Sequence, residues 1–119
     1  RWGLLIGVSL MDLKQHIVAD WATLKIEDAE IDIYGRDSAK FKAMIHEFER
    51  TRDKDKQDSI ADIEKRAFDR TVAMTKEIRG IELDGKAITD AAQLYSLAPG
   101  VYETALNFLN QRANFLPKA

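Results

Sequence analysis

Residues 21–35 have the sequence WATLKIEDAEIDIYG, and this stretch decides the fold. Apolar and polar side chains alternate along both of its halves, which is the two-residue period of a half-buried β-strand. The pair Asp28-Ala29 separates the two halves, and Gly35 ends the second one. The pattern therefore predicts a β-hairpin with four side chains on its buried face, namely Leu24, Ile26, Ile31 and Ile33.

A charged amphipathic helical segment is expected directly after this hairpin. Asp37 and Ser38 are suitable N-cap residues, because their side-chain oxygens can accept hydrogen bonds from the free N–H groups of a first helical turn. Apolar side chains then recur at the i, i+3, i+4, i+7 spacing of one helix face. These side chains are Phe41, Met44, Ile45 and Phe48. We expect the helix to have one apolar face and one charged face.

A second helix is expected to begin at Asp58 or Ser59, which are also good N-cap residues. Its apolar positions continue as far as Ile78, and Gly80 is a candidate C-cap. The charged segment before Asp58 contains neither Gly nor Pro, so a single rod over residues 38–79 is the alternative. We favour a break near Asp58.

Shorter elements complete the chain. Apolar spacing over residues 10–17 predicts a short helix. Asp84-Gly85 predicts a tight hairpin, because glycine adopts a positive φ without strain. Two helices follow, separated by Pro99-Gly100. The predicted fold is α+β and mainly helical: an N-terminal β-hairpin, a charged amphipathic helical segment, a short DG hairpin and two C-terminal helices.

The size and charge of the chain limit the classes of protein it can belong to. Its 119 residues and 13.5 kDa suit one domain. We expect a single globular domain over residues 11–119 and treat residues 1–10 as a candidate vector-derived or non-native leader, because Met11 could be the natural start. A formal charge of −2 gives no general attraction to nucleic acid or anionic membranes. The chain contains no cysteine, which excludes disulfides and thiolate chemistry.

Catalytic and metal-binding patterns are sparse. His16 and His46 have no nucleophile or orienting partner at a motif spacing. The segment from Asp53 to Glu64 places acidic residues at several ligand positions of a calcium-binding EF-hand loop, but Asp58 stands where that loop needs glycine. We therefore expect a non-enzymatic protein with no metal ion and no cofactor, which binds neither nucleic acid nor membranes.

Apolar surface is the remaining candidate for function. Flexible Met and Phe side chains suit a groove that receives a partner helix, because they repack at low cost. The same helix face could instead be the ordinary core of a small domain. The candidate partner-binding residues are Phe41, Met44, Phe48, Phe115 and Leu116.

Three stretches of the chain together resemble a known family. They are residues 31–38 (IDIYGRDS), which lead into the amphipathic helix, residues 80–85 (GIELDG), and residues 101–116 (VYETALNFLNQRANFL). Their order over residues 22–116 resembles the small tail assembly chaperones of long-tailed bacteriophages and related prophages. The chain has Ile81 where we would expect an aromatic residue in that family.

The resemblance implies a non-enzymatic function. Members of this family bind the tape measure protein, the long and largely helical chain that sets tail length, and keep it soluble. They help to recruit tail tube subunits and leave before the tail is finished. The resemblance therefore implies these two partners, action in the host bacterial cytoplasm and absence from the mature virion. The alternative is a small structural head–tail or tail-completion subunit. Exposed apolar helix faces would also allow the chain to form a homo-oligomer.

Overall fold

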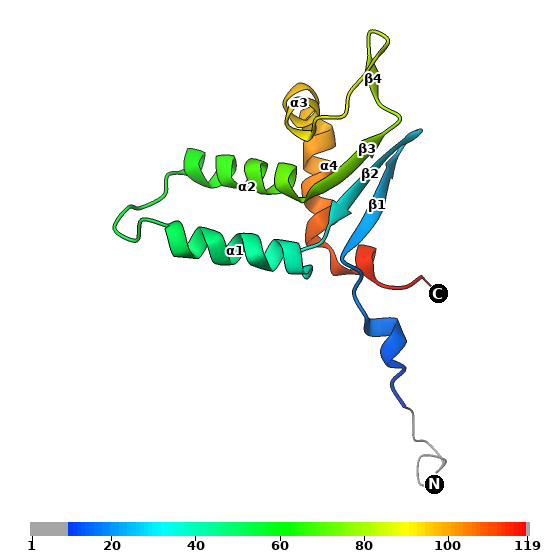
Figure 1. Ribbon diagram of the computed structural model, residues 1–119, viewed down its shortest axis with the longest axis horizontal. Coiled ribbons are helices and arrows are strands. Elements are labelled where there is room, and N and C mark those ends of the chain that lie inside the picture. The colour runs from blue at the N-terminus through cyan, green and yellow to red at the C-terminus, as the bar shows by residue number, and fades with distance from the viewer. Residues whose placement is uncertain (1–9, 119) are drawn as a thin grey trace.

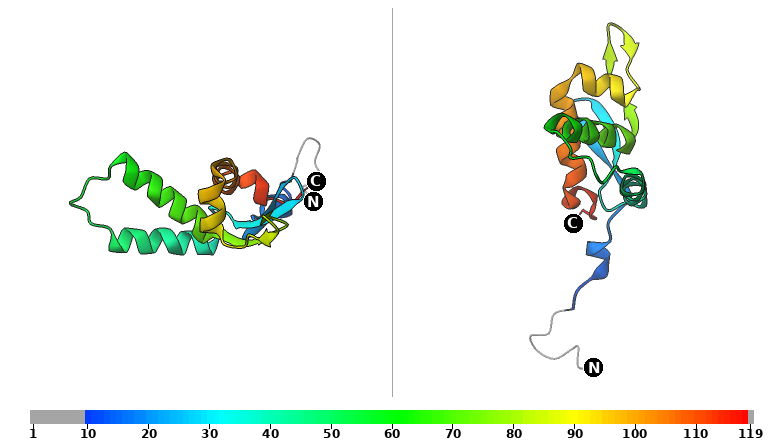
Figure 2. Two further views of the ribbon diagram at one scale, coloured as in Figure 1. Left: turned by 90° about the horizontal axis from the view of Figure 1, so that it is seen from above. Right: turned by 90° about the vertical axis from the view of Figure 1, so that its left-hand side faces the viewer.

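The structure, a computed structural model, describes residues 10–118 and has an α+β architecture (Figure 1). A three-stranded antiparallel sheet in the order β1-β2-β3 forms its centre. Helices α3 and α4 pack against one face of the sheet, and helices α1 and α2 project from the sheet as a helical hairpin (Figure 2). The predicted fold class is confirmed. The candidate leader, residues 1–10, lies outside the described residues except for Leu10.

Strands β1 (Trp21–Ile26) and β2 (Ala29–Tyr34) form the predicted β-hairpin. Its turn consists of Glu27 and Asp28, one residue earlier than expected, and Glu27 has a positive φ of 53°. On the expected inward face the side chains of Leu24, Ile31 and Ile33 are buried. The side chain of Ile26 is partly buried. The alternating pattern therefore identified the core face of the sheet correctly.

The third strand, β3 (Thr75–Arg79), corrects the expectation that the second helix extends past Ile78. β3 pairs antiparallel with β2 and places Ile78 opposite Ile31 in the core. This contact between distant parts of the chain outweighs the helical spacing of the local apolar residues. Gly80 follows a strand rather than capping a helix. Its φ is +78°, and a Cβ there would lie 2.8 Å from the carbonyl oxygen of Asp28.

The predicted break between the two central helices is confirmed. Helix α1 (Ala39–Thr51) begins after Ser38, whose side chain accepts a hydrogen bond from the helix backbone. Helix α2 (Ile60–Met74) begins after Ser59, which forms a reciprocal capping box with Asp62. A loop of charged residues joins the two helices, and the cap at Ser59 marks the end of that loop.

The remaining elements are short, and most of them follow the predicted order. They are β4 (Glu82–Leu83), β5 (Lys86–Ala87), α3 (Ala91–Leu97), α4 (Pro99–Asn110) and the 3-10 helices η2 (Leu13–His16) and η3 (Arg112–Phe115). Asp84 and Gly85 have φ values of 52° and 80°, which suits the tight hairpin turn expected there. Helix η2 is shorter than the helix expected over residues 10–17.

The hydrophobic core lies between the sheet and helices α3 and α4. Tyr95 is almost fully buried, and its hydroxyl lies 2.7 Å from the hydroxyl of Thr75. This burial raises the pKa of Tyr95. The other buried apolar side chains include Leu94 of α3, Ala105 and Leu109 of α4, Met74 at the end of α2, and Ile88, which follows β5. Within residues 10–118, no helix is long and apolar enough to cross a membrane.

Candidate functional site

Helix α1 is firmly attached at its beginning but is poorly covered along its length. Ser38 is buried at the end of the sheet, and its hydroxyl donates a hydrogen bond to the carbonyl oxygen of Gly35 at 2.7 Å. The same hydroxyl oxygen accepts a hydrogen bond from the backbone N–H of Phe41 at 3.1 Å. No residue of α1 is buried. Its apolar stripe is half-buried at every position, namely at Phe41, Met44, Ile45 and Phe48.

Two arginines of α2 cover the aromatic rings of α1. The guanidinium of Arg66 lies 4.5 Å from the centroid of the Phe48 ring. The guanidinium of Arg70 lies 6.0 Å from the centroid of the Phe41 ring. Both contacts fall within the range of cation–π attraction. The inner face of α1 is therefore covered in part by charged side chains that also need water or a counter-ion, and not only by hydrocarbon.

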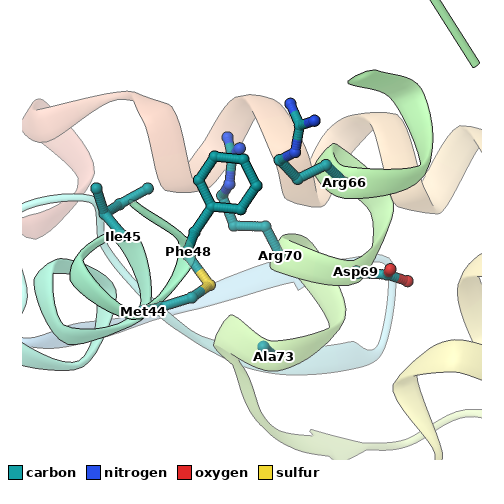
Figure 3. A pocket seen from close by; sticks show the side chains of 7 residues that line it. All are labelled: Met44, Ile45, Phe48, Arg66, Asp69, Arg70 and Ala73. Atoms are coloured by element: carbon teal, nitrogen blue, oxygen red, sulfur yellow. The ribbon is translucent and has the colours of Figure 1, made fainter. Parts of the chain in front are cut away.

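A cavity of about 270 Å³ lies between the two helices (Figure 3). Figure 3 shows the Phe48 ring next to the two guanidinium groups, with Asp69 turned away from them. We call this cavity the hairpin groove. It is lined by Met44, Ile45, Phe48, Arg66, Asp69, Arg70 and Ala73. The walls are thus apolar on the α1 side and mainly charged on the α2 side.

The charges around the hairpin groove are unevenly compensated. Arg66 forms an ion pair with Asp58 at 2.7 Å, and Lys65 forms one with Asp69, also at 2.7 Å. Arg70 forms no ion pair with any carboxylate of residues 10–118. The groove therefore has one arginine whose charge is free to pair with an external anion.

Further apolar surface lies beside the groove. A second hollow of about 500 Å³ is lined by residues of α1 and the turn before it, including Phe41, Ile45 and His46. At the start of α2, Ile60 is 77% exposed and Ile63 is 52% exposed. Ile63 precedes Arg66 by three residues and Arg70 by seven, so it shares their helix face. The apolar surface of the hairpin thus extends toward its tip.

The structure separates the five candidate binding residues into two groups. Phe41, Met44 and Phe48 lie together on α1, beside α2. Phe115 is only 3% exposed, and its ring lies edge-on to Phe108 with centroids 5.5 Å apart. Leu116 follows it and is half-buried. Phe115 is therefore a core residue and contributes nothing to an accessible surface, and Leu116 does not line the cavity between α1 and α2.

Sequence reasoning missed the groove residues that come from α2. Ile45 lines the groove and belongs to the predicted stripe, but it is not among the five predicted binding residues. Arg66 and Arg70 were not singled out, because charged residues at i, i+4 spacing on a helix are usually solvated. Their spacing relative to Ile63 was the one signal in the sequence that could have placed them on a shared face.

The histidines and the acidic residues of the EF-hand-like segment lie apart from the hairpin groove or are engaged in local contacts. His16 and His46 are exposed and lie on separate elements. Asp53 accepts a hydrogen bond from the backbone N–H of Asp55 at 3.0 Å, and Asp58 is held by Arg66. Among residues 10–118, no three His, Asp or Glu side chains are grouped so that they could hold a metal ion.

A separate charged network lies on the face of the sheet opposite the core. The carboxylate of Asp32 accepts hydrogen bonds from Arg79 at 2.7 and 2.9 Å and from the hydroxyl of Thr23 at 2.7 Å. Arg79 also forms an ion pair with Glu30 at 3.1 Å. The hydrogen bonds from Arg79 lower the pKa of Asp32. This network joins β3 to β2 and β1, so its role is structural.

The hairpin groove combines three features that suit contact with another polypeptide. It offers apolar contact area, flexible Met and Phe side chains, and Arg70, which has no ion-pair partner among the described residues. The chain matches no protein-family model, no curated protein and no solved structure.

Proposed function

We propose that this protein is a non-enzymatic tail assembly chaperone of a long-tailed bacteriophage or prophage. It binds the tape measure protein, keeps it soluble and helps to recruit tail tube subunits around it. The observation that carries this proposal is the projecting hairpin, in which the apolar stripe of α1 stays half-buried: Phe41 and Met44 pack against the edge of the core, and Phe48 lies beyond it. The resemblance over residues 22–116 supplies the identity of the partners.

The physical basis of the proposed chaperone function is reversible burial of apolar surface on the tape measure protein. An unassembled tape measure protein exposes apolar helix faces that would otherwise aggregate. Covering about 1,000 Å² of such surface contributes on the order of 25 kcal/mol before costs. Association and side-chain ordering remove much of this gain, so the net binding is reversible. Reversible binding is what a chaperone needs if it is to leave before the tail is complete.

Co-expression with the adjacent tape measure gene tests the proposal. We expect the wild-type chain to increase the soluble fraction of the tape measure protein. Phe48→Asp places a charge in the hairpin groove at a side chain that does not pack against the core, and it should remove that effect. Leu83→Asp is the matched control, because Leu83 is 51% exposed on β4, outside the α1–α2 hairpin. If the tape measure protein is equally insoluble with and without the wild-type chain, the proposal is wrong.

Mass spectrometry of purified virions separates this function from its alternative. A chaperone acts in the host bacterial cytoplasm and should be missing from finished particles. A structural head–tail or tail-completion subunit should be present in every particle at a fixed ratio. Detection of the chain at such a ratio would replace the chaperone proposal with the structural one.

A further inference from the structure

We infer that the hairpin groove receives an amphipathic helix that carries acidic side chains along the edge of its apolar face. This inference rests on the proposed function, because it specifies which segments of a tape measure protein the chaperone would hold. It is carried by three features of the described residues: the shape of the hairpin, the covering of its aromatic rings by arginine, and the unpaired charge of Arg70.

The shape of the hairpin favours a helix as occupant. Helix α1 has 13 residues and is therefore about 20 Å long. Together with α2 it forms two sides of a bundle whose inner faces are only partly covered. A helix with an apolar stripe becomes stable by burying that stripe against another element. A third helix laid along the groove would cover the stripes of both partners over three to four turns.

A partner helix can displace the present covering of the rings. Arg66 and Arg70 are half-buried above Phe48 and Phe41, and cation–π contacts are worth about 0.5–1 kcal/mol at exposed sites and about 2 kcal/mol when desolvated. A Leu or Ile side chain from a partner helix would replace this contact with hydrocarbon packing. The guanidinium group of Arg70, which has no carboxylate partner within residues 10–118, would then lie at the edge of the groove and need a counter-ion.

Charge complementarity indicates that the partner helix carries negative charge beside its apolar face. Arg66 already has Asp58 as its counter-ion, whereas Arg70 has no carboxylate partner within residues 10–118. The two arginines are four residues apart, so their side chains leave α2 about 6 Å from one another on one face. A carboxylate on the partner helix would pair with Arg70, while a lysine in the same place would be repelled.

Two synthetic helical peptides of about 18 residues test this inference, since shorter peptides are rarely helical in water. Both carry the same Leu stripe; one is flanked by Glu and the other by Lys. We expect wild-type protein to bind the Glu peptide up to about tenfold more tightly than the Lys peptide at low salt, because the contact with Arg70 is attractive for Glu and repulsive for Lys. The preference should shrink as salt is raised, because screening weakens exposed charge pairs.

Charge reversal supplies the decisive comparison. Arg70→Glu should invert the preference toward the Lys peptide, and Arg70→Gln should abolish it. Lys86→Glu is the matched control, because it reverses the charge of an exposed side chain on β5, outside the α1–α2 hairpin and outside the lining of the groove. We expect it to leave the preference unchanged. The inference would be overturned if the wild type bound both peptides equally or if Arg70→Glu kept the wild-type preference. Phosphatidylglycerol vesicles are the third probe, and binding to these vesicles but to neither peptide would also overturn the inference.

Co-expression with the tape measure protein separates the two proposals. If the wild type and Arg70→Glu keep the tape measure protein equally soluble, the acidic-helix inference fails and the chaperone function stands. If the wild type prefers the Glu peptide but does not affect the solubility of the tape measure protein, the chaperone function fails and the groove specificity stands.

Discussion

Replacing Phe115 by alanine should destabilise the protein much more than the same change at Phe48. Phe115 is 3% exposed and packs edge-on against Phe108, so its truncation removes both apolar burial and close packing. Truncation of a buried phenylalanine costs about 3–5 kcal/mol. Phe48 is half-buried on the projecting helix α1, and its truncation should cost about 1 kcal/mol, a value typical of a partly exposed position.

Urea unfolding followed by far-ultraviolet circular dichroism measures this difference. With a slope of about 2 kcal/mol per molar urea, the two changes lower the midpoint by about 2 M and about 0.5 M. Phe48→Ala serves as the control for the loss of an aromatic ring as such. A midpoint for Phe115→Ala within about 0.5 M of wild type would refute the assignment of Phe115 to the core. An equally large loss for Phe48→Ala would refute the exposure of α1.

The remaining predictions concern close packing and pH. Gly35→Ala should lower the free energy of unfolding by about 1–3 kcal/mol, because a Cβ would lie 3.0 Å from three atoms of the buried Phe115 ring. An unchanged melting temperature would contradict this contact. Hydrogen bonds from Arg79 lower the pKa of Asp32, so this pair stabilises the fold above about pH 4 and the contribution is lost as pH falls through the folded-state pKa. Asp32→Asn should therefore flatten the acid side of the stability–pH curve, and a variant with the wild-type curve would refute the role of the pair. Burial raises the pKa of Tyr95, so its contribution is complete below about pH 10 and is lost as pH rises through the folded-state pKa. Tyr95→Phe should cost about 1 kcal/mol at neutral pH and reduce the alkaline loss, which thermal melts between neutral and alkaline pH would detect.

The features that the sequence predicted correctly depend on neighbours in the chain. The N-caps predicted at Ser38 and Ser59 are local hydrogen-bonding patterns, and the structure contains both. The Asp84-Gly85 turn depends on the backbone freedom of two adjacent residues. The alternation in β1 and β2 depends only on which side chains face the core.

The features that the sequence could not predict depend on contacts between distant residues. Met74 and Ile78 have the spacing of one helix face, yet Ile78 belongs to a strand because Ile31 lies opposite it. Phe115 is buried because Gly35, 80 positions earlier, leaves room for its ring. An apolar stripe such as that of α1 has the same sequence pattern whether it is covered or open, so only the three-dimensional structure shows how far it is exposed.

Hydrogen–deuterium exchange of this chain, alone and bound to the tape measure protein, tests the claim that the α1–α2 hairpin is a docking surface. Without the partner, the amides of α1 should exchange faster than those of α4, because α1 has no buried residue and α4 packs in the core. With the partner, exchange should slow along α1 and the facing part of α2 and stay unchanged in α4. Protection that appears only on the sheet or on the C-terminal helices, with α1 unaffected, would contradict the account.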